Sequence, residues 1–156
     1  MHPLLRVCVA FIATYGAGLV AYLFVDSRIG SWYEGLVKPA LTPPDETFVF
    51  VWLVLYALMA LSLGIVWTKD TSKNEHEGWV RFYFVQLLFN AAWTIFFFGF
   101  HAVILSFVVI LFLGFMVLAL IANAAEIDRR VVYLLLPYLA WIIFGGYLTL
   151  SIWWLN

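Results

Sequence analysis

Charged residues are scarce in this sequence of 156 residues. They make up 11% of the chain, whereas hydrophobic residues make up 66%. A soluble domain has about 25% charged and about 45–50% apolar residues. The composition therefore excludes an ordinary soluble domain and predicts an integral membrane protein. The formal net charge of −1, without a basic cluster, also excludes a nucleic-acid partner.

Residues that bind metals are also few. The single cysteine, Cys8, excludes an internal disulfide and a cysteine-based metal cluster. The three histidines are His2 near the start, His76 in a polar stretch and His101 between two apolar runs. None is placed for fixed haem ligation. No phosphate loop and no nucleophile beside a base is recognisable. We therefore predict no metal site and no required cofactor.

The long apolar runs contain no Asp, Glu, Lys or Arg beyond their ends. Ion-coupled and proton-coupled transporters place such groups on their pathways. Their absence argues against coupled transport but leaves slow facilitated movement open. A ligand of such a protein is expected to be large, flat and apolar, held by shape, stacking and a few amide or hydroxyl contacts.

Five apolar runs are long enough to cross a bilayer, which takes about 20 residues each. They lie at residues 4–25, 48–67, 79–98, 102–124 and 131–154. No clear cleavage site follows the first run, so we expect it to be a retained helix. The runs are continuous rather than alternating, which excludes membrane β-strands. The prediction is an all-α membrane protein, a single domain over residues 1–156 that forms a five-transmembrane-helix bundle. A long ordered loop joins helices 1 and 2, and a solvated loop is expected at residues 68–78.

The basic residues indicate the orientation. With the N-terminus in the cytoplasm, six of the eight lie on the inner side and two, Arg28 and Lys38, lie outside. Because basic residues favour the cytoplasmic side, we predict a cytoplasmic N-terminus and an outer C-terminus.

Residues 31–52, SWYEGLVKPALTPPDETFVFVW, form the only sizeable polar-aromatic segment. Its three prolines fix their own φ and bias the preceding residues away from helix, so the part after Lys38 should be stiff and extended. Trp32, Tyr33 and Leu36 have the spacing of a short helix at a membrane surface. Two interpretations stay open: an ordered loop with interfacial anchors, or a lid over a pocket.

Three helices carry aromatic and amide side chains at helical spacing. The stripes are Phe48, Trp52 and Tyr56; Gln86, Asn90, Trp93 and Phe97; and Pro137, Trp141, Phe144, Gly145 and Leu148. An amide that faces lipid costs several kcal/mol, so Gln86 and Asn90 should face the bundle. There they would bond a neighbouring helix or a ligand, and the spacing does not decide between these.

In combination, these residues resemble the TspO/MBR family of tryptophan-rich sensory proteins and translocator (peripheral benzodiazepine receptor) proteins. The resemblance runs through nearly the whole chain. It rests on Trp32-Tyr33-x-x-Leu36-x-Lys38-Pro39-x-x-x-Pro43-Pro44, Phe48-x-x-x-Trp52, Leu55-Tyr56, Gln86-Leu87-x-x-Asn90-x-x-Trp93-x-x-x-Phe97-Phe98, Leu136-Pro137-Tyr138-x-x-Trp141 and Tyr147-Leu148.

The resemblance implies a multi-pass membrane receptor or sensor, commonly a homodimer, whose loop 26–47 covers a pocket open to the outer side. Its implied ligands are porphyrins such as protoporphyrin, other tetrapyrroles and isoquinoline-type compounds. Carried over by motif, the ligand-binding residues are Trp32, Tyr33, Pro43, Trp52, Tyr56, Asn90, Trp93, Phe97, Trp141, Phe144 and Gly145. Trp52 and Trp141 are the implied candidates for a light- and oxygen-dependent porphyrin breakdown.

The sequence departs from the family pattern at a few positions. Leu41 and Glu46 stand where tryptophan is frequent, which makes the loop rim less aromatic, and Thr149 replaces a frequent asparagine. No Lys or Arg follows Arg130, so the cholesterol consensus of animal members is absent, which favours a microbial cell membrane. A receptor, a porphyrin-degrading enzyme, a facilitated transporter of tetrapyrroles or lipids, and a structural partner subunit remain the alternatives.

Overall fold

The computed structural model describes residues 2–23, 29–69 and 73–156. In chain order the helices are α1 (Pro3–Leu23), α2 (Ile29–Gly35), α3 (Asp45–Thr68), α4 (Lys73–Thr94), the π-helical turn η1 (Ile95–Gly99), α5 (Val103–Ile127) and α6 (Arg129–Leu155). The predicted end of the first helix at residue 25 and the start of the loop at 26–28 lie outside the described residues. Within them, the all-α prediction is confirmed.

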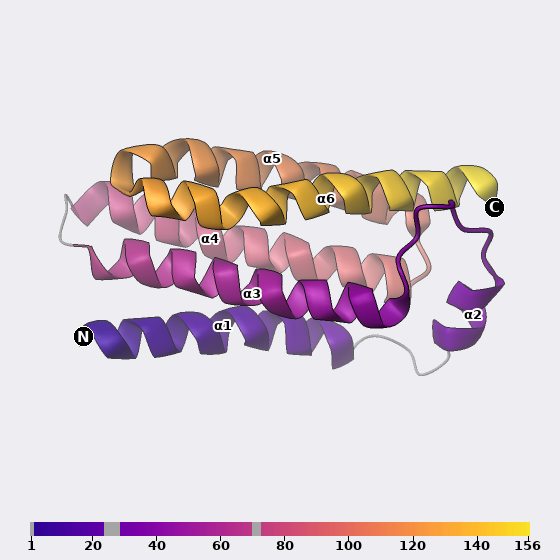
Figure 1. The fold of residues 1–156 in the computed structure, drawn as a ribbon, viewed down its shortest axis with the longest axis horizontal. Coiled ribbons are helices and arrows are strands. Elements are labelled where there is room, and N and C mark those ends of the chain that lie inside the picture. Colours follow the sequence, from indigo (N-terminus) through magenta and orange to yellow (C-terminus); the bar gives the residue numbers. More distant parts are fainter. Residues whose placement is uncertain (1, 24–28, 70–72) are drawn as a thin grey trace.

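The long helices form an elongated bundle with the N-terminus and the C-terminus at opposite ends (Figure 1). Around the bundle, α1 packs on α3, α3 on α6, α6 on α5, α5 on α4, and α4 back on α1. The pair α4 and α5 are antiparallel neighbours, as the short connection between them predicts. The short helix α2 lies at the same end of the bundle as the C-terminus (Figure 1).

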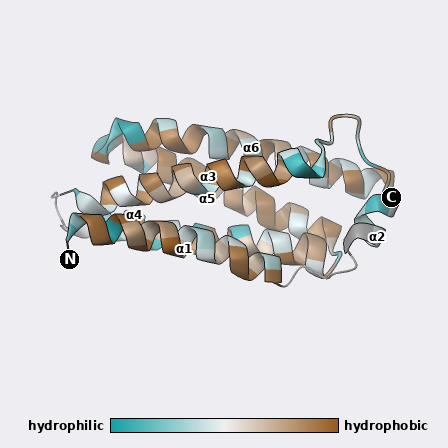
Figure 2. Cartoon of the chain, turned by 60° about the horizontal axis from the view of Figure 1, so that its bottom comes forward, coloured by the Kyte–Doolittle hydropathy of each residue, from teal (hydrophilic) through white to brown (hydrophobic). Residues whose placement is uncertain are grey.

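Five helices of the described chain are long and apolar enough to cross a membrane, which confirms the five predicted spans. Hydrophobic residues line much of their length and the hydrophilic positions concentrate towards the ends (Figure 2). Only 17–39% of each apolar window is buried inside the bundle, so most of the apolar surface faces outward. Because such a surface is stable only in hydrocarbon, the chain is an integral multi-pass membrane protein.

The prediction of a solvated loop over residues 68–78 is wrong for its second half. Helix α4 begins at Lys73, six residues before the apolar run starts at Trp79, and His76 is buried. The physical reason is that hydropathy marks where a helix enters the membrane, not where it begins. Lys and Glu are good helix formers in water, so the polar stretch continues the helix beyond the bilayer.

The third span ends in a π-helical turn, which the sequence pattern did not predict. Turn η1 places Phe97 in the core and is followed by Phe100, whose backbone N–H donates to the carbonyl of Ile95 at 2.9 Å. His101 follows with a φ of 54°, a left-handed conformation that is uncommon for a residue with a side chain. π-Turns within helices occur frequently at functional sites, and this one adjoins the aromatic residues of the candidate site.

At the opposite end of the bundle, Asp128 joins three helices. Its carboxylate accepts a hydrogen bond from the backbone N–H of Arg130 at 2.9 Å and so caps the start of α6. It also forms ion pairs with Lys69 at the end of α3 and with the Arg130 side chain, each at 2.8 Å. These contacts fix the ends of α3, α5 and α6 relative to one another.

Candidate functional site

Four polar side chains form a hydrogen-bonded chain across the core of the bundle. Tyr56 of α3 donates to Asn90 of α4 at 2.9 Å, and Asn90 donates to Tyr138 of α6 at 3.0 Å. Tyr138 in turn donates to Gln86 at 3.0 Å. Gln86, Asn90 and Tyr138 are buried. The prediction that both amides face the bundle is therefore confirmed, and of the two partners that the spacing left open the structure shows side chains of neighbouring helices.

A cavity of about 730 Å³ lies beside this chain, between α1, α3 and the end of α4. Its lining is aromatic and aliphatic, with no charged side chain: Ile12, Tyr15, Gly16, Gly18, Leu19, Tyr22, Phe48, Val49, Trp52, Leu53, Tyr56, Trp93, Thr94 and Phe98. The ring centroids of Trp52 and Trp93 are 6.1 Å apart, and those of Trp52 and Tyr56 are 5.4 Å apart. Its volume lies within the roughly 300–1,000 Å³ typical of small-molecule sites.

The cavity opens sideways, at the level of the membrane spans. Several of its lining residues on α1 and α3 are exposed on the outside of the bundle, among them Ile12 (72%), Tyr22 (69%) and Leu53 (50%). Gly16 adds no side chain to this opening, since a Cβ built there meets nothing within 4 Å. The mouth therefore lies on the outer surface of the bundle, between side chains of α1 and α3.

The loop end of the site is closed by aromatic contacts from α2. Trp32 stacks on His101 with ring centroids 4.0 Å apart and meets the edge of Phe97 at 5.7 Å. Tyr33 packs edge-on against Phe98 at 5.7 Å, and the Lys38 ammonium lies 4.1 Å from the Tyr33 ring centroid. Burial, with a smaller effect of a nearby carboxylate, raises the pKa of Tyr33. The predicted short helix is thus confirmed as α2.

A smaller hollow of about 170 Å³ lies beneath this loop. It is lined by Tyr33, Pro43, Asp45, Phe48, Val49 and Phe98. Three of these, Phe48, Val49 and Phe98, also line the larger cavity. The two spaces are therefore neighbours that share part of their lining.

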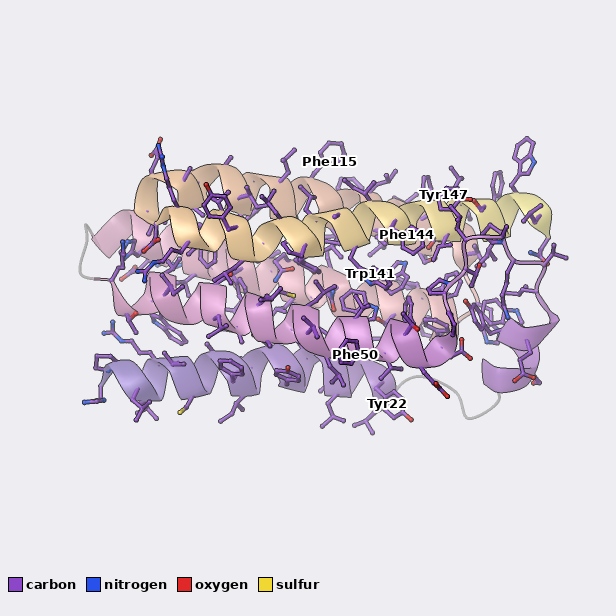
Figure 3. The ribbon with its side chains drawn as sticks, in the orientation of Figure 1. Tyr22, Phe50, Phe115, Trp141, Phe144 and Tyr147 are labelled. Atoms are coloured by element: carbon purple, nitrogen blue, oxygen red, sulfur yellow. The ribbon has the colours of Figure 1, made fainter. Side chains whose placement is uncertain are left out.

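The predicted residues of α6 lie apart from the cavity lining. Trp141 is on the side of α6 that faces α3, where its ring contacts Phe48 at 5.7 Å and Phe144 at 5.4 Å (Figure 3). Phe48 stands between Trp141 and the cavity. Gly145 is buried against α5, since a Cβ built on it lies 3.1 Å from Ile110. The remaining predicted residues gather around the cavity, the polar chain or the α2 contacts.

Sequence reasoning did not assign three contributing residues to the site. Tyr138 belongs to the motif on which the family resemblance rests but was not predicted as a site residue; it has the helical spacing of the buried residues Leu135 and Ile142. Tyr15 and Gly18 of α1 were also missed. Tyr15 donates to the Leu53 carbonyl at 2.7 Å, and Gly18 leaves room for the Tyr56 ring, whose nearest atom is 2.6 Å from a Cβ built there. The Tyr-x-x-Gly spacing on one helix face was the available signal.

The side chains at this site are suited to binding an organic ligand rather than a metal ion. Within the described residues no cluster of three or more His, Cys, Asp or Glu side chains is placed to hold a metal ion. The polar groups at hand are hydroxyls, amides and the indole N–H of Trp93, which is buried without a partner among the described residues. Such a site can stack a flat ligand and offer it a few hydrogen bonds.

Comparison with known proteins gives one consistent answer. A sequence profile of the TspO/MBR family matches residues 8–155. The chain is 34% identical over 149 residues to the tryptophan-rich protein TspO of Bacillus cereus, covering 95% of each chain. It is 32% identical over 139 residues to that of Chlorobaculum tepidum, covering 89% of this chain and 88% of the relative. It is 32% identical over 124 residues to the translocator protein of Sus scrofa, covering 78% and 73%. This chain belongs to the TspO/MBR family.

Proposed function

We propose that this protein is a membrane receptor that binds porphyrins and related flat, apolar ligands in the cavity between α1, α3 and α4. The observation that carries the proposal is the lining of that cavity. Trp52, Trp93 and Phe98 offer aromatic faces, Tyr56 and Thr94 offer hydroxyls, and no charge is present. Aromatic rings stack favourably on a macrocycle of this kind. Relatives named as sensory and translocator proteins support a receptor role.

The route of entry follows from the position of the mouth. A porphyrin dissolved in the bilayer meets the opening between exposed side chains of α1 and α3. At the loop end, by contrast, access is restricted by the contacts of Trp32 and Tyr33. We therefore propose entry from the lipid, with α2 and the loop acting as the end wall of the site.

The test is a titration with protoporphyrin IX of the protein in lipid nanodiscs, followed by tryptophan fluorescence in the dark. Saturable quenching is expected, with affinity lowered about tenfold in Trp52→Phe, because each aromatic contact is worth about 0.5–1.5 kcal/mol. Trp154→Phe is the matched control, since Trp154 is exposed at the end of α6. The proposal fails if quenching does not saturate, or if both variants lose the same affinity.

A second candidate is photochemical breakdown of the bound porphyrin. Two indoles that line the cavity, Trp52 and Trp93, favour it, because an excited porphyrin or the oxygen species that it generates oxidises indole readily. Trp141 lies behind Phe48 and is therefore expected to contribute less than Trp52. Illumination with oxygen should then change the porphyrin spectrum, and Trp52→Phe should slow that change more than Trp141→Phe. An unchanged spectrum would leave only the receptor.

Orientation and assembly are part of the proposal. Six of the eight basic residues support a cytoplasmic N-terminus, and the loop, α2 and C-terminus would then lie outside a microbial membrane. Accessibility of single cysteines introduced at Glu34 and Glu77 to an impermeant reagent in intact cells tests this. The homodimer suggested by the family resemblance is tested by chemical crosslinking in the membrane.

A further inference from the structure

The hydrogen bonds of the polar chain all run in one direction. Tyr56 donates to Asn90, Asn90 donates to Tyr138, and Tyr138 donates to Gln86. Every hydrogen therefore points away from the cavity and towards Gln86. The Nε2 amino group of Gln86 is fully buried at the end of this series and has no partner among the described residues. A buried donor without an acceptor is costly, so this direction leaves the chain incomplete.

The opposite direction fits the same positions of the heavy atoms. A side-chain amide turned by 180° exchanges its oxygen and nitrogen while filling nearly the same volume. With both amides turned, Gln86 donates to Tyr138, Tyr138 donates to Asn90, and Asn90 donates to Tyr56. The Gln86 amino group then has an acceptor, and the hydroxyl hydrogen of Tyr56 leaves the chain.

In the reversed direction, the hydroxyl hydrogen of Tyr56 needs an acceptor in the cavity. Of the four residues, only Tyr56 lines the cavity. The hydroxyl of Tyr15, which also lines the cavity, already donates its own hydrogen to the carbonyl of Leu53. The lining offers the hydrogen of Tyr56 no carbonyl or carboxylate oxygen from a side chain, only other hydroxyls, so a ligand that supplies such an oxygen favours the reversed direction.

We propose, on the basis of the ligand cavity proposed above, that the site selects flat ligands that carry a carbonyl or carboxylate oxygen at Tyr56. When such an oxygen binds, the three hydrogen bonds of the polar chain reverse their direction. The buried Gln86 amino group gains its partner in the same step. Tyr56 is the contact residue, and Gln86 is a positioning residue that acts through Tyr138 and Asn90. A hydrocarbon of the same shape supplies no acceptor, so the hydrogen bonds of the polar chain stay directed towards Gln86.

The test uses 9-fluorenone and fluorene, two flat molecules of nearly the same shape that differ in one carbonyl group. Their affinities are measured by calorimetry with the protein in nanodiscs, and empty nanodiscs are subtracted. The quantity compared is the ratio of the two affinities in each variant. Partition of each probe into the lipid is the same for all variants, so it cancels when the ratios are compared. Infrared spectra of bound fluorenone report directly whether its carbonyl accepts a hydrogen bond.

Tyr56→Phe should lower the preference for fluorenone by roughly three- to tenfold, which corresponds to one hydrogen bond. It should also remove the shift of the carbonyl band to lower frequency. Tyr15→Phe is the matched control, because it deletes a hydroxyl from the same cavity that is already committed to the backbone. Equal ratios in the wild type and Tyr56→Phe, loss in Tyr15→Phe instead, or no binding of fluorenone overturns the proposal.

Gln86→Met tests the positioning role. Without the amide oxygen of Gln86, the Tyr138 hydroxyl is expected to donate to Asn90 instead. The hydrogen bonds of the polar chain would then be directed towards Tyr56 even before a ligand binds. The preference for fluorenone should therefore rise, by about two- to tenfold, whereas a purely structural residue would leave the ratio unchanged or lower it. A protoporphyrin titration of the same samples reports separately on the proposed function, because fluorenone selection can hold where porphyrin binding fails, and the reverse.

Discussion

The side-chain amide of Asn156 pairs with the backbone of Val37 through two hydrogen bonds. The Val37 N–H donates to Oδ1 and Nδ2 donates to the Val37 carbonyl, each at 3.0 Å, although the residues are 119 positions apart in the chain. This pair attaches the loop after α2 to the end of α6. Together with the aromatic contacts of α2, this pair holds the polar-aromatic segment at this end of the bundle.

Breaking that pair should free the loop without unfolding the bundle. In Asn156→Ala the two hydrogen bonds to Val37, worth about 1 kcal/mol each, are lost, together with one to the carbonyl of Ile152 within α6. Amide hydrogen exchange of residues 36–44 should then become roughly tenfold or more faster. Asn123→Ala is the control, since Asn123 is exposed and bonds only within its own helix. Unchanged exchange in Asn156→Ala would show that the aromatic contacts of α2 alone hold the loop.

Gly16 offers a way to fill the cavity mouth. A side chain there projects into open space, so Gly16→Leu should be tolerated and should even favour the helix by up to about 1 kcal/mol. Protoporphyrin affinity should nevertheless fall tenfold or more, because the added side chain occupies the lipid-facing entrance. Gly78→Leu, equally unobstructed but at the other end of the bundle, should bind as the wild type does. Full binding by Gly16→Leu would exclude the lateral route.

The sequence predicted the spans and the inward-facing amides because both depend on a strong free-energy penalty. Charge and amide groups are costly in hydrocarbon, which fixes the span positions and turns Gln86 and Asn90 inward. The start of α4 at Lys73 was missed because no such penalty applies in water, where polar residues form helix equally well. Hydropathy therefore locates the membrane better than it locates the helix ends.

The rest of the site depends on contacts between distant residues. Nothing in the local pattern pairs Asn156 with Val37 or places the Tyr138 hydroxyl between two amides. The family resemblance supplied most of the aromatic residues around the cavity. It could not show that Trp141 stands behind Phe48 or that Gly145 faces α5, because both facts follow from how the helices are rotated in the bundle.

Tyr138→Phe should destabilise the bundle more than its small change in volume suggests. The substitution removes an acceptor for Asn90 and a donor for Gln86 inside the buried core. Leaving such groups unpaired costs about 1–3 kcal/mol, so the midpoint of thermal unfolding in detergent should fall by several degrees. Tyr133→Phe, at an exposed position of the same helix, should leave the midpoint unchanged. Equal unfolding midpoints for both variants would mean that the polar chain of hydrogen bonds does not contribute to the stability of the bundle.

Acid should weaken the end of the bundle at which α5 and α6 meet, through Asp128. Hydrogen bonds from Arg130, and then from Lys69, hold the pKa of this carboxyl below its usual range. A depressed pKa means that the carboxylate stabilises the fold fully above the unfolded value of about 3.9, and that this stability is lost as pH falls further, through the folded value. In Asp128→Asn the loss of stability between neutral pH and about pH 3 should therefore be smaller than in the wild type.

Asp128→Ala should cost about 1 kcal/mol at neutral pH, because the cap of α6 is also lost. Thermal unfolding across this pH range measures both effects, with Glu126→Gln, at an exposed neighbouring position, as the control. Parallel acid curves for Asp128→Asn and the wild type would show that the ion pairs at this end do not contribute to stability.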